Sequence, residues 1–288
     1  MRGRAFAWVA LAYAVAGAVG VGAGRLAPTD SPLLIAAVAT FAATLAIFAF
    51  SLSFNNSSFY DAYWSVAPIP IVFYWAENPP GDDVNSVRMA LVLTAVTVWG
   101  VRLTYNWARQ WQGLHHEDWR YVDKRREFPR AYWVVSLTGL HVMPTILVFI
   151  GLLPCWVALG APARPIGPID GLALLAVCTA IYFETVADKQ LRDFMDRPRA
   201  PGESLTSGLW GLCRHPNYFG EVLFWWGLFL FGLAANPTAW WCGAGALAMS
   251  VLFRVVSLPL MERRAAERRK DWDRISREIP LILPWPRL

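Results

Sequence analysis

Long hydrophobic runs, separated by short polar segments, dominate the chain from one end to the other. A helix needs roughly 20 apolar residues to cross a bilayer, and eight stretches approach that length. We predict eight membrane-spanning helices, at residues 6–24, 33–54, 59–76, 87–108, 133–153, 168–187, 218–235 and 238–258. The pattern therefore predicts an all-α, polytopic integral membrane bundle.

The third of these stretches is the weakest. It carries Asp61, and Pro68 and Pro70 interrupt it. Proline removes a backbone hydrogen bond inside a helix, and the freed groups need protein or water around them at membrane depth. We expect a broken or re-entrant segment here, which would leave seven full spans.

Basic residues alternate between the loops and predict the orientation. Arg2 and Arg4 precede the first span, and the loops after the fourth and sixth spans are rich in arginine and lysine. Cytoplasmic loops carry such an excess, so we expect a multi-pass protein of a bacterial inner (plasma) membrane with both termini in the cytoplasm. The basic segment 262–277 is interpreted either as a cytoplasmic amphipathic helix or as a solvated tail.

Composition supports the membrane assignment. The chain has 288 residues, of which 56% are hydrophobic, whereas soluble domains contain about 45–50% apolar residues. The net charge of +5 lies in short loops, where membrane orientation explains it, so no nucleic-acid partner is expected. His115 and His116 are adjacent and the four cysteines form no CxxC pair, so no metal is expected. We treat residues 1–288 as one membrane domain.

Ionisable and amide side chains collect where the spans meet the cytoplasm. Such groups are costly inside a membrane, so each is a candidate for function. They could line a polar cavity for an anionic cofactor, or they could pair with one another and hold helices together. The candidates are Arg102, Tyr105 and Asn106 in the fourth span, Glu184 and Asp188 in the sixth, Glu221 in the seventh, and Arg254 in the eighth.

Three segments in the C-terminal third resemble the steroid 5α-reductase superfamily, and most closely its bacterial multi-span branch. They are "YFETVADKQLRDF" (182–194), "GLWGLCRHPNYFGEVLFWWG" (208–227) and "IPLILPWP" (279–286). The isoprenylcysteine carboxyl methyltransferases also carry an "RHPxYxG" element. The resemblance covers residues 55–288 and implies a reductase-like catalytic core there, with 1–54 as accessory helices.

For the site, the resemblance implies that NADPH lies among the C-terminal helices. Asn217 and Glu221 match cofactor-contacting positions, as do Asp188 and Arg254, while Asp61 takes the place of a catalytic glutamate. The family's catalytic tyrosine falls at Trp99, so Tyr105 is the substitute we consider. The remaining cofactor candidates are Arg214, His215, Tyr218, Glu184 and Asn106.

These observations lead to a main expectation and two alternatives. The main one is an NADPH-dependent reductase of a conjugated carbon–carbon double bond in a hydrophobic or lipid substrate, with Asp61 or Tyr105 as the acid. The first alternative is a methyltransferase that holds S-adenosylmethionine in the same place, since carboxylates and aromatic rings suit its cation. The second is a non-catalytic lipid-binding protein, whose charged pairs would close on one another.

Overall fold

Seven long apolar helices form the bundle. The computed structural model describes residues 2–79, 81, 83–160, 164–198 and 200–285, and these contain no β-strand. The helices long and apolar enough to cross a membrane are α1 (Arg2–Arg25), α2 (Pro32–Ser53), α5 (Ser86–Gln110), Tyr132–Gly160, α10 (Pro168–Asp196), α12 (Pro216–Ala235) and Pro237–Arg268. The predicted all-α membrane fold is confirmed.

Two of these long helices are composite. The helix Tyr132–Gly160 consists of α7 (Tyr132–Val135), a π-helical segment η2 (Ser136–Val142), α8 (Met143–Gly151) and α9 (Leu153–Gly160). The last one consists of η3 (Pro237–Gly243), α13 (Ala244–Leu252), a second π-helical segment η4 (Phe253–Ser257) and α14 (Leu258–Arg268). Irregular turns of this kind often occur near functional sites.

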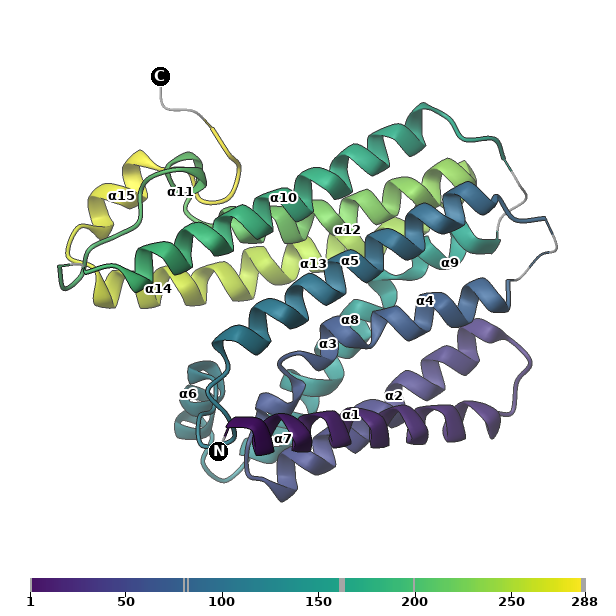
Figure 1. Cartoon of the computed structure of the whole chain (residues 1–288), viewed down its shortest axis with the longest axis horizontal. Coiled ribbons are helices and arrows are strands. Elements are labelled where there is room, and N and C mark those ends of the chain that lie inside the picture. Colours follow the sequence, from purple (N-terminus) through teal and green to yellow (C-terminus); the bar gives the residue numbers. More distant parts are fainter. Residues whose placement is uncertain (1, 80, 82, 161–163, 199, 286–288) are drawn as a thin grey trace.

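The third predicted span is broken, as its prolines suggest. A 3₁₀ turn, η1 (Ser57–Tyr60), precedes two short helices, α3 (Tyr63–Val66) and α4 (Pro68–Glu77). Figure 1 shows α3 and α4 running beside α5, from the end of the bundle where α2 finishes to the end where α5 begins. The segment Tyr63–Glu77 therefore runs along the bundle but is not among the seven helices of the described residues that are long and apolar enough to cross a membrane. Asp61 lies before it, outside these seven helices.

The first helix begins and the last helices finish at the same end of the bundle (Figure 1). We call this the polar end; it also carries α6 (Trp119–Glu127), α11 (Leu209–Leu212) and α15 (Trp272–Glu278). The prediction of one amphipathic helix over 262–277 was wrong, because α14 continues the last span and α15 packs separately through buried Trp272 and Ile275. The backbone NH of Arg214 donates to the carbonyl of Pro280 at 2.9 Å, so the tail folds back onto the bundle.

Close packing of α10 against α12 brings the candidate residues together. A Cβ atom on Gly220 would lie 2.6 Å from Cγ of Glu184, and one on Gly227 would lie 2.7 Å from Cγ2 of Val177. Only glycine permits this approach, as in other membrane helix pairs with small residues at the interface. Glu184 of α10 and Glu221 of α12 consequently face each other.

A buried ion pair ties α5 to α10 at the opposite end. Nε of Arg88 lies 2.7 Å from Oδ1 of Asp170, and both side chains are almost fully buried. Asp170 also accepts the backbone NH of Gly167 at the start of α10. The pair fixes the two helices whose other ends carry the site.

Candidate functional site

An acidic cluster joins α5, α10 and α12 at the polar end. Arg102 forms an ion pair with Glu184, and its Nη1 lies 3.0 Å from Oδ2 of Asp188. Asn106 donates to the same Asp188 oxygen at 2.9 Å and accepts from Arg192 at 2.9 Å. The site prediction had grouped Glu184, Asp188 and Asn106, and the structure places them together.

Glu221 is held by two indoles. Trp99 donates to one carboxyl oxygen at 3.1 Å, and Trp225 donates to the other at 2.9 Å. Trp99 also stacks on Phe224 with ring centroids 4.8 Å apart and planes within 6°. Trp99, which stands where the resemblance places a tyrosine, is therefore a core residue and not an acid.

Asp61 meets the first turn of α6. The hydroxyl of Tyr121 donates to Oδ1 of Asp61 at 2.6 Å, and Arg120 forms an ion pair with Asp118 at 2.7 Å. Burial raises the pKa of Asp61 from its ordinary 3.8 to about 6, against the opposing charge of Arg120. The Arg120 side chain remains 47% exposed, so this group is open to a ligand.

Tyr218 lies within electrostatic range of both α6 and the acidic cluster. It lies near the start of α12, close enough to Arg120, Asp118 and Asp188 to be affected by their charges. Asn217, its neighbour, reaches Asp188 with Nδ2 at 3.5 Å from Oδ1. Asp61 and the acidic cluster thus belong to one polar region, contributed by both halves of the chain.

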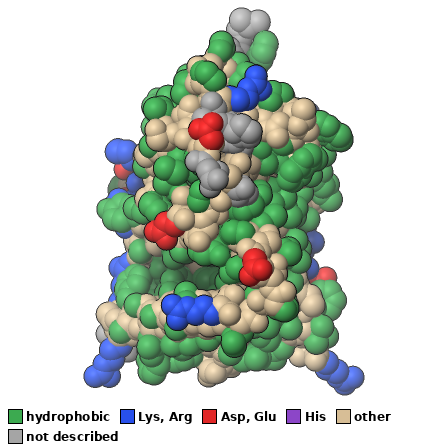
Figure 2. All heavy atoms as spheres, turned by 90° about the vertical axis from the view of Figure 1, so that its right-hand side faces the viewer, with side chains coloured by type: hydrophobic (Ala, Val, Ile, Leu, Met, Phe, Trp, Pro, Cys, Tyr) green, Lys and Arg blue, Asp and Glu red, His purple; other side chains and the backbone are tan. Residues whose placement is uncertain are grey.

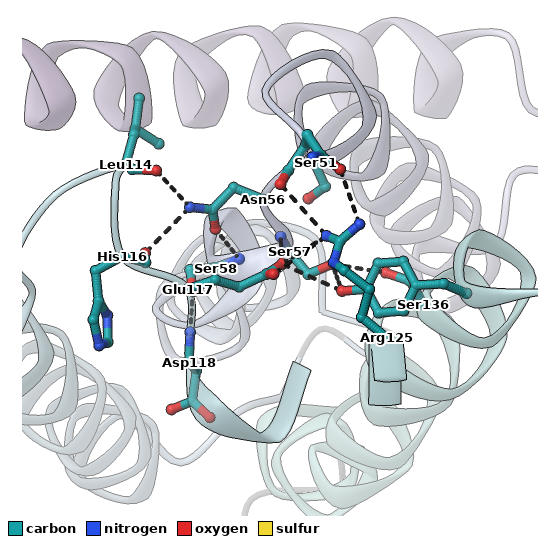
Figure 3. Close-up of polar contacts among 12 residues, drawn as sticks. Ser51, Asn56, Ser57, Ser58, Leu114, His116, Glu117, Asp118, Arg125 and Ser136 are labelled. Carbon is teal, nitrogen blue, oxygen red and sulfur yellow. Dashed lines mark hydrogen bonds and ion pairs between the residues drawn. The ribbon is translucent and has the colours of Figure 1, made fainter. Parts of the chain in front are cut away.

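A hydrogen-bond network holds the loop before α6 in place (Figure 3). Glu117 accepts the backbone NH of Ser57 at 2.7 Å and pairs with Arg125 of α6 at 3.2 Å. Asn56 donates to the carbonyls of Leu114 and His116 at 2.9 and 3.2 Å. Because these bonds tie the start of η1 to the residues just before Asp118, and Glu117 is tied in turn to α6, they help to set where Arg120 and Tyr121 lie.

The same network continues into the bundle through hydroxyl groups. Ser57 contacts the hydroxyls of Tyr132 and Ser136, at 2.7 and 2.9 Å. His141 is fully buried, with Ser51 3.0 Å from its Nε2 and the Ser136 carbonyl 2.9 Å from its Nδ1. The interpretation of His141 as a hydrogen-bonded packing residue agrees with these contacts.

Arg214 and His215 are already paired. Nη1 of Arg214 lies 2.9 Å from one oxygen of Glu262, and Nε2 of His215 lies 2.7 Å from the other. Glu262 belongs to α14, so the "RHP" segment at the start of α12 is fastened to the last helix. Arg264, also of α14, lies 3.7 Å from the Trp119 ring and connects this helix to α6.

Two predicted residues lie apart from the polar region. Tyr105 is 60% exposed on α5, with Arg109 over its ring. Arg254 is exposed on η4, and within the residues that the structure describes it has no ion pair or hydrogen bond. Tyr121, which is not among the site residues predicted from the sequence, is the tyrosine that contacts Asp61.

Some buried donors near the site have no hydrogen-bond partner among the described residues. They are Nε of Arg102 and Nε of Arg214. Buried polar atoms are nearly always paired, so these two donors are exceptions within the described residues. Among the residues that the structure describes, no group of three or more histidine, cysteine, aspartate or glutamate side chains is close enough to hold a metal ion.

Comparison with known proteins gives one family and one relative. Residues 47–277 match the model of a family described as "Protein of unknown function (DUF1295)". The "Uncharacterized protein C594.04c" of Schizosaccharomyces pombe is 25% identical over 232 residues, which is 72% of this chain and 67% of that protein. No solved structure matches significantly.

Proposed function

The chain belongs to the DUF1295 family, and we propose that it is a membrane-embedded, NADPH-dependent reductase of a carbon–carbon double bond conjugated to a carbonyl group in a hydrophobic substrate. The observation that carries the proposal is the environment of Asp61. Its pKa of about 6 makes the protonated form accessible near neutral pH, and Tyr121 fixes its orientation.

Asp61 supplies the acid. In its protonated form it donates a hydrogen bond to the substrate carbonyl oxygen, where negative charge develops. Removing a positioned donor of this kind typically lowers the rate by about 100- to 1000-fold. At pH 7 protonating Asp61 costs about 1.4 kcal/mol, which is small beside that gain. Tyr121 accompanies it as a positioning residue, because it contacts Asp61 through its hydroxyl.

The residues around this acid fit a dinucleotide of mixed polarity. Asp188 and Asn217 would hold ribose hydroxyls, since carboxylates and amides accept and donate such bonds. Arg120, half-exposed, and Arg264 of α14 would hold phosphates. Bound there, NADPH supplies a hydride to the substrate, and the chain supplies position and charge. Arg214 and His215 are less suited than expected because Glu262 occupies both.

One observation favours a second candidate, a methyltransferase that uses S-adenosylmethionine. The acidic cluster contains three carboxyl groups, of Glu184, Asp188 and Glu221, but only two guanidinium groups, of Arg102 and Arg192. An excess of carboxylates suits a sulfonium cation better than a phosphate. The two candidates therefore differ in the charge of the ligand that the cluster holds.

A ligand-stabilisation experiment separates these functions. The detergent-purified protein is heated with NADPH, NADH or S-adenosylmethionine, and its apparent melting temperature is recorded. We expect NADPH to raise it, and Arg120→Gln and Asn217→Ala to remove most of that increase. Arg126→Gln is the matched control, because Arg126 lies in the same helix as Arg120, α6, and its side chain is 79% exposed.

The outcomes are distinct. Stabilisation by S-adenosylmethionine alone would overturn the reductase proposal and favour the methyltransferase. No response to any of the three, with the charged pairs closed as they are around Arg102 and Glu262, would favour a non-catalytic lipid-binding protein. We also propose that the protein lies in a bacterial inner membrane with both termini in the cytoplasm. This orientation gives the polar end access to soluble cofactors.

A further inference from the structure

A cavity lies between α1, α2 and the broken segment α3–α4, and none of the acidic-cluster residues lines it. Its volume is about 510 Å³, within the range of about 300–1,000 Å³ usual for ligand sites. Gly17, Gly20, Ala39, Ala43 and Ile71 contribute to walls that are mostly small and apolar. Figure 2 shows a hollow walled by hydrophobic side chains on the face opposite the polar end.

The length of the cavity matches a lipid chain. It extends along α1 from Tyr13 to Arg25, which at the rise of an α-helix is about 18 Å. The hydrocarbon region of one leaflet is about 15 Å deep, half of the bilayer core. The hydroxyl of Tyr13 donates to the carbonyl of Phe59 at 3.0 Å and lies at the deep end. The cavity is therefore about as deep as one leaflet.

The mouth of the cavity carries a cation. Arg25 is the only charged residue among those that line the cavity, and it is exposed at the end of α1. Within the described part of the chain it forms no ion pair or hydrogen bond. An arginine at the end of an apolar channel is complementary to a phosphate group whose hydrocarbon tail enters the channel.

We propose that this cavity binds one acyl chain of an anionic membrane lipid, with the lipid phosphate at Arg25. Most of the walls come from α1 and α2, whose first residues lie outside the family match at 47–277. The site therefore belongs largely to the N-terminal helices, and the proposal is independent of the reductase activity.

Two glycines of α1 give a matched pair of variants. A Cβ atom at Gly17 or at Gly22 would have nothing within 4 Å, but only Gly17 lines the cavity. Gly17→Phe should fill the cavity, and Gly17→Leu should fill it partly. Gly22→Phe adds the same side chain to the same helix outside the cavity, so it controls for the change in helix propensity.

The test measures bound lipid by native mass spectrometry after exhaustive delipidation and addition of phosphatidylglycerol or phosphatidylcholine. We expect wild type and Gly22→Phe to retain one phosphatidylglycerol, and Gly17→Phe to lose most of it, with Gly17→Leu between them. Arg25→Gln should lower the preference for phosphatidylglycerol over phosphatidylcholine about fivefold, which corresponds to one surface charge.

Each comparison can overturn the proposal. Equal retention by Gly17→Phe and Gly22→Phe, both shown to be folded by an unchanged melting temperature, would exclude the cavity as the lipid site. An unchanged headgroup preference in Arg25→Gln would exclude the assignment of the phosphate to Arg25. The partly filled variant keeps the test decisive if Gly17→Phe does not fold.

Discussion

Replacing Asp61 by asparagine should stabilise the protein at neutral pH while reducing its activity. The folded protein holds the pKa of Asp61 near 6, whereas an unfolded chain would have the ordinary value of 3.8. Between these two pH values the folded protein binds a proton that the unfolded chain has lost. The free energy of unfolding therefore falls as pH rises through this window and stays lower above pH 6.

The structure sets an upper limit for this effect. A difference of about 2.2 between the two pKa values corresponds to about 3 kcal/mol. Asp61 keeps part of its surface accessible to water, so the real effect is smaller. At about 2 °C per kcal/mol for a protein of this size, we expect the variant to melt about 2–6 °C above wild type at pH 7.5.

The assay is apparent melting temperature in detergent, recorded from pH 4 to pH 8 for wild type and Asp61→Asn. Wild type should lose stability across pH 4–6 relative to the variant, and the two curves should converge below pH 4. Tyr121→Phe is a second arm: because the Tyr121 hydrogen bond lowers the pKa of Asp61, its removal should shift the window to higher pH. An Asp61→Asn variant that is less stable at pH 7.5, with the wild-type slope retained, would refute the reasoning.

Three further predictions concern the packing of the site, all measured by thermal melting in detergent unless stated. Arg102→Ala leaves Glu184 and Asp188 without the cation that pairs with them and should lower the free energy of unfolding by about 3–5 kcal/mol. Arg254→Ala is its control and should change that free energy by no more than about 0.5 kcal/mol. Equal losses in the two variants would contradict the pairing. Gly220→Ala places a Cβ atom 2.6 Å from Cγ of Glu184 and should lower the free energy of unfolding by about 1–3 kcal/mol. Gly171→Ala has nothing within 4 Å of the new Cβ atom and should be neutral or stabilising. Similar changes in stability for the two variants would argue against close packing of α10 on α12. Glu262→Ala releases Arg214 and His215 from α14, which loosens the attachment of that helix and should speed tryptic cleavage after Arg268. Glu267→Ala removes a solvent-exposed pair with Arg263 and should not.

Hydropathy predicted the spans well because their signal is local. The predicted 33–54, 87–108 and 218–235 differ from α2, α5 and α12 by no more than two residues at either end. The sixth span was placed at 168–187, but α10 continues to Asp196. Its last turns carry Arg192 and other charged residues, so they are helical without being apolar, and hydropathy alone does not register them.

The residues of the site were easier to predict than their partners. Glu184 and Asp188 stood out because charged groups are rare in membrane helices. The contact of Tyr121 with Asp61 spans 60 positions, and the pairing of His215 with Glu262 spans 47. Neither follows from helical periodicity, which relates only residues three or four apart. Such contacts depend on how whole helices pack, and this information is not local in the sequence.

Glu221 illustrates how packing changes the role that a motif implies. The resemblance makes it a cofactor residue, yet both of its oxygens accept indole donors, from Trp99 and Trp225. A ligand that bound Glu221 directly would have to displace one of them from a core position with no exposure to water. Leaving a buried indole donor unpaired costs about 1–3 kcal/mol. Glu221 is therefore better placed to anchor α5 against α12 than to hold a ligand.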